Sequence, residues 1–271
     1  MNADMIRSIA LIGAPTDINS SFLRGPAKAP ARIRAQLGSD HGNRAAESGL
    51  EIGRGILLDD RGDLPLTEGA GDDALIEQGV LAALADGAVP IILGGDHAIT
   101  YPIMRAMAAR HGPLNILHVD AHPDLYDELL GNRRSHASPF ARIMEDGLAD
   151  RLVQVGIRTL NAHQAEQAKR FGVEIVAMRD FSPDKVPVMC GPLYISIDLD
   201  GLDPAFAPGV SHHEPGGLSV REVLNVLARQ TARLVGADVV ELNPDRDIND
   251  MTAAVAAKFV KELAGMAARP T

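Results

Sequence analysis

Residues 116–124 read ILHVDAHPD, an apolar run that leads directly into acidic and imidazole side chains. Two other segments end in the same way: residues 91–97 read IILGGDH, and residues 194–200 read YISIDLD. Continuous runs of Val, Ile and Leu are typical of parallel strands covered on both faces. Because ligand sites of open α/β sheets gather beyond the carboxyl ends of the strands, these polar residues should meet at one edge.

Short apolar runs and helical patterns alternate along the rest of the chain. This order predicts right-handed βαβ units and a doubly wound α/β sheet. We expect strands at 6–12, 89–93, 114–119, 152–155, 173–176, 193–197 and 234–240. We expect helices at 27–37, 72–85, 99–110, 139–146, 162–170, 220–229 and 249–264. Residues 38–65 are polar and glycine-rich, and we interpret them as an irregular insertion.

Composition excludes several classes of function. The chain has 36 acidic and 26 basic side chains and a net charge of -10, which argues against a nucleic-acid or anionic-membrane partner. One cysteine, Cys190, excludes an internal disulfide framework and a cysteine-rich zinc site. No run reaches the roughly 18 apolar residues that a membrane span needs. We therefore expect a cytoplasmic location.

The acidic and imidazole residues have the spacing of a metal site. Asp120, His122 and Asp124 are spaced i, i+2, i+4, which in an extended segment places them on one face. Asp198 and Asp200 repeat that spacing on another strand. With His97, these groups offer four carboxylates and two imidazoles. Such a cluster repels itself unless carboxylates take up protons or cations bind between them.

Two divalent cations would neutralise this cluster. Oxygen-rich ligands with two histidines suit Mn²⁺ better than the softer sites that zinc prefers, although ligand type leaves nickel, cobalt and iron open. Each residue alone has a simpler explanation. A single Asp after a strand is usually a helix cap or turn residue. His118 is expected to be a satisfied core group or a neighbour of a ligand. The joint occurrence on three segments favours metal binding.

The same residues resemble the ureohydrolase (arginase and agmatinase) family along essentially the whole chain. The strongest motifs are GGDH at 94–97, DAHPD at 120–124 and SIDLDGLDP at 196–204. The segments SHAS at 135–138, APGVSH at 207–212, EPGGLS at 214–219 and DVVE at 238–241 resemble the plant-type arginases, an agmatinase-like branch. The resemblance implies one catalytic domain over residues 1–271 with three α/β/α layers and a mostly parallel eight-stranded sheet. It also implies two Mn²⁺ ions per subunit and a homotrimer or homohexamer.

The resemblance further implies the roles of individual residues. The metal ligands would be His97, Asp120, His122, Asp124, Asp198 and Asp200, with two of the aspartates bridging. The two cations would make hydroxide available near neutral pH for attack on the guanidinium carbon. Asp124 would orient that hydroxide. His136 would protonate the departing amine, and Glu241 would pair with the substrate guanidinium.

The substrate beyond its guanidino group depends on loops. We assign Asn132, Asn161 and His212 to substrate binding, together with His136 and Glu241. A carboxylate received by Asn132, Arg133 or Arg134 would favour L-arginine, whereas Asp127 or Glu128 could receive the free amine of agmatine. Plant-type similarity favours arginine, and agmatine, guanidinobutyrate and guanidine stay open. An inactive metal-binding partner subunit and a deacetylase of related fold are the more distant alternatives.

Overall fold

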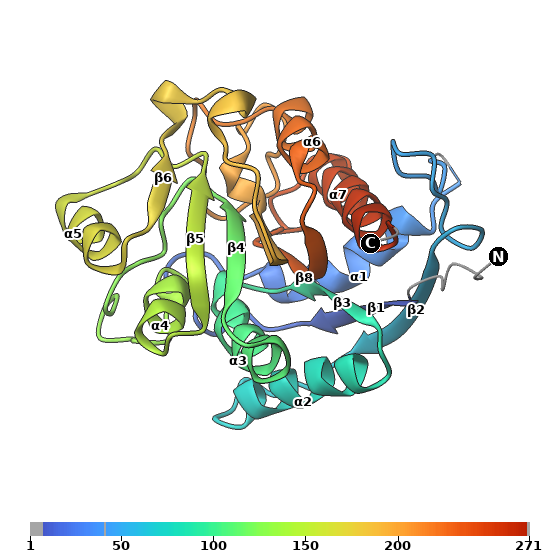
Figure 1. Cartoon of the computed structure of the whole chain (residues 1–271), viewed down its shortest axis with the longest axis horizontal. Helices are drawn as coiled ribbons and strands as arrows, with labels where there is room; N and C mark the ends of the chain where they lie inside the picture. The colour runs from blue at the N-terminus through green and yellow to red at the C-terminus, as the bar shows by residue number, and fades with distance from the viewer. Residues whose placement is uncertain (1–7, 41, 270–271) are drawn as a thin grey trace.

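A computed structural model describes residues 8–40 and 42–269 of the chain. Its centre is an eight-stranded sheet in the order β2-β1-β3-β8-β7-β4-β5-β6, and every pairing is parallel (Figure 1). The strands are β1 (Ser8–Ala14), β2 (Leu57–Asp63), β3 (Val89–Gly94), β4 (Leu114–Val119), β5 (Ala149–Val155), β6 (Glu174–Val176), β7 (Pro192–Asp198) and β8 (Arg233–Val240). The predicted α/β fold with an eight-stranded sheet is confirmed.

Helices cover both faces of the sheet. The α-helices are α1 (Ala29–Leu37), α2 (Asp72–Ala85), α3 (Thr100–His111), α4 (Pro139–Glu145), α5 (Ala162–Phe171), α6 (Val220–Arg229) and α7 (Met251–Ala267). Short 3-10 helices are η1 (Pro26–Lys28), η2 (His97–Ile99), η3 (Met178–Asp180), η4 (Pro183–Lys185) and η5 (Leu199–Gly201). Helices α1, α6 and α7 lie on one side of the sheet and α2, α3, α4 and α5 on the other (Figure 1). One apolar core joins the sheet to the first group, and a second joins it to the other.

Alternation along the central strands explains the two cores. In β3, Ile91 and Leu93 belong to the core beneath α1 and α7, whereas Ile92 belongs to the core beneath α2 and α3. Successive side chains of a strand point to opposite faces, so a strand covered on both sides needs apolar residues at every position. The apolar runs therefore predicted these strands correctly.

Strand β2 was missed, and the prediction of an irregular insertion over 38–65 is wrong there. Its sequence, LLDDRGD, has no apolar run because β2 is an exposed edge strand paired only with β1. Charged side chains are common on sheet edges, where they discourage pairing with other chains. Arg34 of α1 contacts this edge, with its Nε 3.0 Å from Asp60 and its Nη2 2.9 Å from the carbonyl of Gly62. Residues 6 and 7 of the predicted first strand lie outside the described residues.

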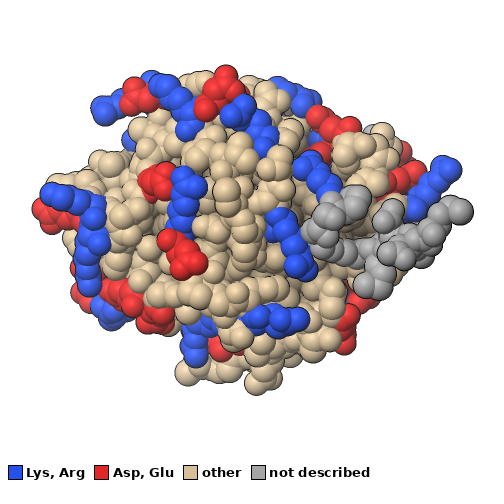
Figure 2. Space-filling model, in the orientation of Figure 1, with Lys and Arg blue, Asp and Glu red and all other residues tan. Residues whose placement is uncertain are grey.

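The strand order decides where functional side chains meet. Strands β3, β8, β7 and β4 are consecutive in the middle of the sheet, so the segments that follow them share one edge. On the face drawn in Figure 2, Lys and Arg are interspersed with Asp and Glu, and this face has no continuous basic stripe. No helix within residues 8–40 and 42–269 is long and apolar enough to cross a bilayer.

Candidate metal centre

All six predicted metal ligands converge at the carboxyl edge of the central strands. His97 begins η2 after β3, Asp120 follows β4, and Asp198 ends β7. Five of the six are buried, with 0 to 5% of their surface exposed, and only the His122 side chain is partly open, at 25%. The segments that follow three strands thus bring together ligands, such as His97 and Asp200, that lie more than 100 residues apart in the sequence.

His97 forms the deepest part of this cluster. Its Nδ1 lies 3.2 Å from Asp120 Oδ2, 3.1 Å from Asp124 Oδ2 and 3.1 Å from Asp198 Oδ2. Its Nε2 lies 2.9 Å from the hydroxyl of Ser196. Burial disfavours the charged imidazole, but the surrounding carboxylates outweigh it and raise the pKa of His97 well above its ordinary value. The carboxylates therefore require positive charge where Nδ1 points.

His122 forms a second, more open part of the cluster. Its Nδ1 lies 3.1 Å from Asp200 Oδ2 and 3.4 Å from Asp120 Oδ1. Asp120 thus presents Oδ2 to His97 and Oδ1 to His122. Burial, followed by the charges of Asp200 and Asp120, raises the pKa of Asp198 well above its usual range. Carboxylates crowded in this way gain stability from a bound cation, so the chemistry of the donors fits metal ions.

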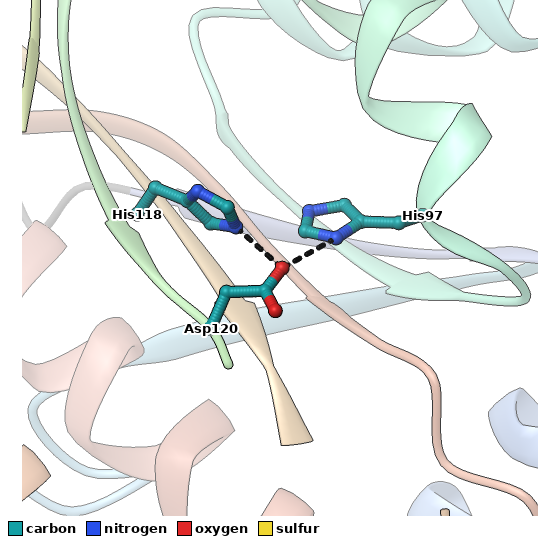
Figure 3. A group of neighbouring side chains, drawn as sticks. All are labelled: His97, His118 and Asp120. Carbon is teal, nitrogen blue, oxygen red and sulfur yellow. Dashed lines mark hydrogen bonds and ion pairs between the residues drawn. The ribbon is translucent and has the colours of Figure 1, made fainter. Parts of the chain in front are cut away.

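His118 is a neighbour of the cluster (Figure 3). Its Nδ1 lies 3.0 Å from the Gln154 amide nitrogen, a donor, so Nδ1 accepts and the proton resides on Nε2. That Nε2 donates to Asp120 Oδ2 at 2.8 Å, and the ring stacks on Phe140 with centroids 4.0 Å apart. His118 therefore orients Asp120, as expected for a satisfied group beside a ligand.

Two site residues have a left-handed backbone without being glycine. Asp124 has φ 51° and Glu241 has φ 64°. Such conformations cost free energy and persist where the surrounding structure imposes them, often at functional sites. Close packing holds this region in place: a Cβ on Gly95 would lie 1.7 Å from the carbonyl oxygen of Thr16. Only glycine permits that approach.

His136 and Glu241 form a buried pair beside the cluster. His136 Nδ1 lies 2.9 Å from Glu241 Oε1, which also accepts a hydrogen bond from the backbone N–H of His97 at 2.9 Å. His136 Nε2 lies 2.9 Å from the hydroxyl of Ser21. Burial opposes protonation of the imidazole, but the Glu241 carboxylate outweighs it and raises the pKa of His136 to about 9. The imidazole is held in its proton-carrying form.

A cleft of about 200 Å³ opens onto the cluster. His136 and His212 lie in its wall with ring centroids 5.2 Å apart. Glu241 lies behind His136, 3% exposed. No Lys or Arg from the described part of the chain lines it. The lining residues are Ser21, His122, Asp124, Tyr126, Leu129, His136, Ala137, Thr159, Gln164, Asp198, Asp200, His212 and Glu214.

Besides Glu241, two predicted substrate residues lie outside this lining. Asn132 donates from its side chain to Asn19 Oδ1 at 3.0 Å. Asn161 is the N-cap of α5 and donates to the hydroxyl of Tyr126, a lining residue, at 2.6 Å. Their contact with substrate stays a prediction, and Asn161 has a clear indirect role in holding Tyr126. Glu214 and Ser21 line the cleft although the sequence interpretation assigned them no role in the site.

Three of the four other charged residues considered for the substrate's far end contact side chains elsewhere in the chain. Arg133 contacts Glu145, with Nη2 3.1 Å from Oε2, and Arg134 contacts Asp73, with Nη2 2.8 Å from Oδ1. Asp127 accepts a hydrogen bond from Gln167 at 2.6 Å. None of these three side chains lines the cleft, so Glu214 is the carboxylate of the lining that lies outside the metal cluster.

Comparison with known proteins supports the geometry. A sequence model described as "Arginase family" matches residues 7–265. "Arginase 1, mitochondrial" of Arabidopsis thaliana is 52% identical over 95% of this chain and 80% of its own length. "Arginase 2, chloroplastic/mitochondrial" of the same plant is 51% identical over 94% and 79%. The solved structure of arginase from Medicago truncatula superposes with a TM-score of 0.92 and 43% identity, covering 97% of this chain and 88% of that one.

The prediction of a cytoplasmic location is wrong on this comparison. Both Arabidopsis relatives have names that assign them to mitochondria or chloroplasts, which points to an organelle. The prediction had rested on composition and on the lack of an apolar run long enough to cross a membrane. Neither property specifies a cellular compartment, because proteins of many compartments share both.

Proposed function

This chain belongs to the arginase family, and from that premise we propose that it hydrolyses the guanidino group of L-arginine to urea and ornithine. One observation carries the proposal. His97 Nδ1 faces three carboxylates within 3.2 Å, and Asp120 joins that group to His122. A hydrolytic metal centre explains why the fold tolerates so much like charge.

We propose that the cluster holds two Mn²⁺ ions per subunit. The ligands would be His97, Asp120, His122, Asp124, Asp198 and Asp200, with two aspartates shared between the ions. Oxygen donors with two imidazoles favour Mn²⁺ over softer metals. When bound, such ions lower the pKa of water and stabilise negative charge as it develops on the substrate. The two nitrogen donors, His97 Nδ1 and His122 Nδ1, both point into the cluster.

We assign the other catalytic and binding roles to residues in and beside the cleft. Asp124 lines the cleft and belongs to the cluster, so we assign it the orientation of the attacking oxygen. His136 carries a proton at neutral pH because Glu241 stabilises its charged form, and we assign it protonation of the departing amine nitrogen. Glu241 is also our proposed partner for the guanidinium. His212 and Thr159 bound the space for the rest of the substrate.

The acidic lining of the cleft suits a cationic substrate. The lining contains four carboxylates, of Asp124, Asp198, Asp200 and Glu214, and no basic side chain from the described residues. The proposed metal ions would balance the charge of the three aspartates, which leaves the Glu214 carboxylate to face the cationic substrate. The guanidinium end of L-arginine would enter toward the metal cluster. Its α-carboxylate would then need a hydroxyl donor such as Ser21 at the cleft wall, because the Thr159 hydroxyl already donates to the carbonyl oxygen of Ala121.

A urea-release assay tests the function directly. The protein, stripped of metal with a chelator and reloaded with Mn²⁺, should release urea from L-arginine in preference to agmatine, guanidinobutyrate and guanidine. The stripped protein is the matched control and should be inactive until Mn²⁺ is restored. If another compound of the panel released urea and L-arginine did not, the assignment of L-arginine as the substrate would be contradicted. Full activity of the stripped protein would contradict the metal centre.

We also propose that the whole chain is one catalytic domain that assembles as a homotrimer or homohexamer, as the family resemblance implies. Sedimentation velocity would test the assembly. A species with the mass of one subunit at micromolar concentration would contradict it.

A further inference from the structure

Asp238 lies in β8 beside the metal centre and contacts none of its carboxylates. It is fully buried and accepts hydrogen bonds from three hydroxyl groups: Ser196 to Oδ1 at 2.6 Å, and Tyr194 and Thr100 to Oδ2 at 2.7 and 2.9 Å. No Lys or Arg of the described ranges pairs with it. A buried carboxylate without a cation needs several donors, and the three hydroxyls supply them.

These contacts define the direction of the next hydrogen bond. Ser196 and Asp238 are opposite each other in the β7–β8 pairing. The Ser196 hydroxyl has one proton and gives it to Asp238, so its oxygen can only accept from His97 Nε2, 2.9 Å away. His97 therefore carries its proton on Nε2, and the lone pair of a neutral His97 lies on Nδ1.

We propose that Ser196 and Asp238 are positioning residues that hold His97 in the tautomer able to bind metal. Nδ1 is the atom surrounded by Asp120, Asp124 and Asp198, at 3.1 to 3.2 Å. A metal-binding histidine is oriented and made more basic by the acceptor on its other nitrogen. The inference rests on the proposed metal centre and extends it to two residues that touch neither metal nor substrate.

The contrast with the second histidine supports a dedicated role. His122 Nε2 lies 3.7 Å from the Glu214 carboxylate, on the wall of the open cleft. Ser196, Asp238, Tyr194 and Thr100, in contrast, are all fully buried. We call the hydrogen-bonded chain from Asp238 through Ser196 to His97 the relay. Asp238 and Ser196 lie on central strands, so the geometry of the relay does not depend on a loop.

Isothermal titration of the metal-stripped protein with Mn²⁺ tests the relay without reference to turnover. Ser196→Ala removes the acceptor and should weaken Mn²⁺ binding by about 10- to 100-fold. Asp238→Asn should weaken it further. The new amide would donate to Ser196, which would then donate to His97 Nε2 and move the imidazole proton to Nδ1. Tyr194→Phe removes one donor to the same carboxylate but keeps this direction, so it should change affinity by less than about threefold.

A spectroscopic signature separates positioning from simple stability. In ¹⁵N-histidine protein loaded with diamagnetic Cd²⁺, the buried Nε2–H of His97 should give a slowly exchanging proton signal, and Ser196→Ala, which removes the acceptor of this proton, should speed its exchange and shift the signal upfield. If Asp238→Asn does not fold, Ser196→Ala decides the question. Wild-type Mn²⁺ affinity in folded Ser196→Ala would overturn the relay alone. Absence of Mn²⁺ binding by the unaltered protein would overturn the metal centre and the relay together.

Discussion

The two histidines of the cluster lie in different surroundings. His97, with Asp124 and Asp198, forms an inner half in which the imidazole is fully buried. His122, with Asp200, forms an outer half in which the imidazole is 25% exposed and lines the cleft. Asp120 joins the halves by giving one oxygen to each. Both halves follow the carboxyl ends of β3, β4 and β7, and they differ in the exposure of their imidazoles: that of His97 is enclosed, whereas that of His122 lines the cleft.

The distant nitrogen of each imidazole shows the same difference. On the inner side, Nε2 of His97 continues into Ser196 and Asp238 through short, buried hydrogen bonds. On the outer side, Nε2 of His122 faces Glu214, whose side chain is 39% exposed. A rigid inner half can fix metal affinity, while an adaptable outer half can admit substrates of different shape.

The largest effect is expected where the halves join. Asp120→Ala removes a carboxylate shared by both histidines, and Asp198→Ala removes one that faces His97. We expect either change to abolish urea release and the rise in melting temperature that Mn²⁺ causes, because a ligand that binds only the folded state stabilises it by about 2.7 kcal/mol at 100 times its dissociation constant.

The control for this experiment is Asp150→Ala, an exposed acid near the amino end of β5, at the opposite edge of the sheet from the cluster. It should keep both activity and the Mn²⁺-dependent shift. Unchanged melting and turnover in Asp120→Ala would mean that these carboxylates do not bind the metal.

The contrast between the halves also explains what the sequence could predict. The inner half follows from strand patterns: an apolar run identifies a strand, its end identifies an edge, and β3, β4 and β7 meet there. Strand β2 could not be found in this way, because its exposed edge position leaves it with the polar sequence LLDDRGD. Ser196 and Asp238 lie on predicted strands, and a polar residue inside an apolar run was the available signal for both.

The contacts of the substrate loops were harder to predict than either half of the cluster, because loop conformation decides them. Asn132 and Asn161 were placed at the substrate from their position in loops, yet both side chains hydrogen-bond to other residues of the protein. Glu214 reaches the cleft because Arg158 holds its carbonyl oxygen with Nε at 2.8 Å and Nη2 at 2.5 Å. No local sequence pattern predicts a contact between two residues that are 56 positions apart.

A large effect on turnover is expected from His136, which lies between the cluster and the cleft. His136→Ala removes the proposed proton donor, so kcat should fall by about 10² to 10⁴ while KM changes much less. Steady-state kinetics with L-arginine in saturating Mn²⁺ would measure both. Ser21→Ala is a useful companion, because it removes a contact of the same imidazole without removing the imidazole. A rise confined to KM in His136→Ala would assign this residue to binding instead.

A shift in titration is expected when the partner of His136 is neutralised. The pKa of His136 is raised to about 9, chiefly because Glu241 opposes the effect of burial. In the metal-free protein, this pair should stabilise the fold fully below about pH 6.5, and the stabilisation should disappear as pH rises through about 9. Glu241→Gln should lower the pKa of His136, measurable from its ring proton resonances. An unchanged value would show that another group holds the charge.

The smallest effect is expected from Glu214, in the outer half. Its carboxylate adds negative charge to a cleft that already attracts cations, and its partly exposed position limits the energy to about 1 kcal/mol. Glu214→Gln should therefore raise KM for L-arginine by about fivefold or less and leave kcat and Mn²⁺ affinity nearly unchanged. Titration calorimetry would measure the Mn²⁺ affinity of this variant, and steady-state kinetics would measure its KM and kcat. If Mn²⁺ binding weakened as much as in Ser196→Ala, Glu214 would orient His122 as Asp238 orients His97, and the outer half would be as firmly positioned as the inner one.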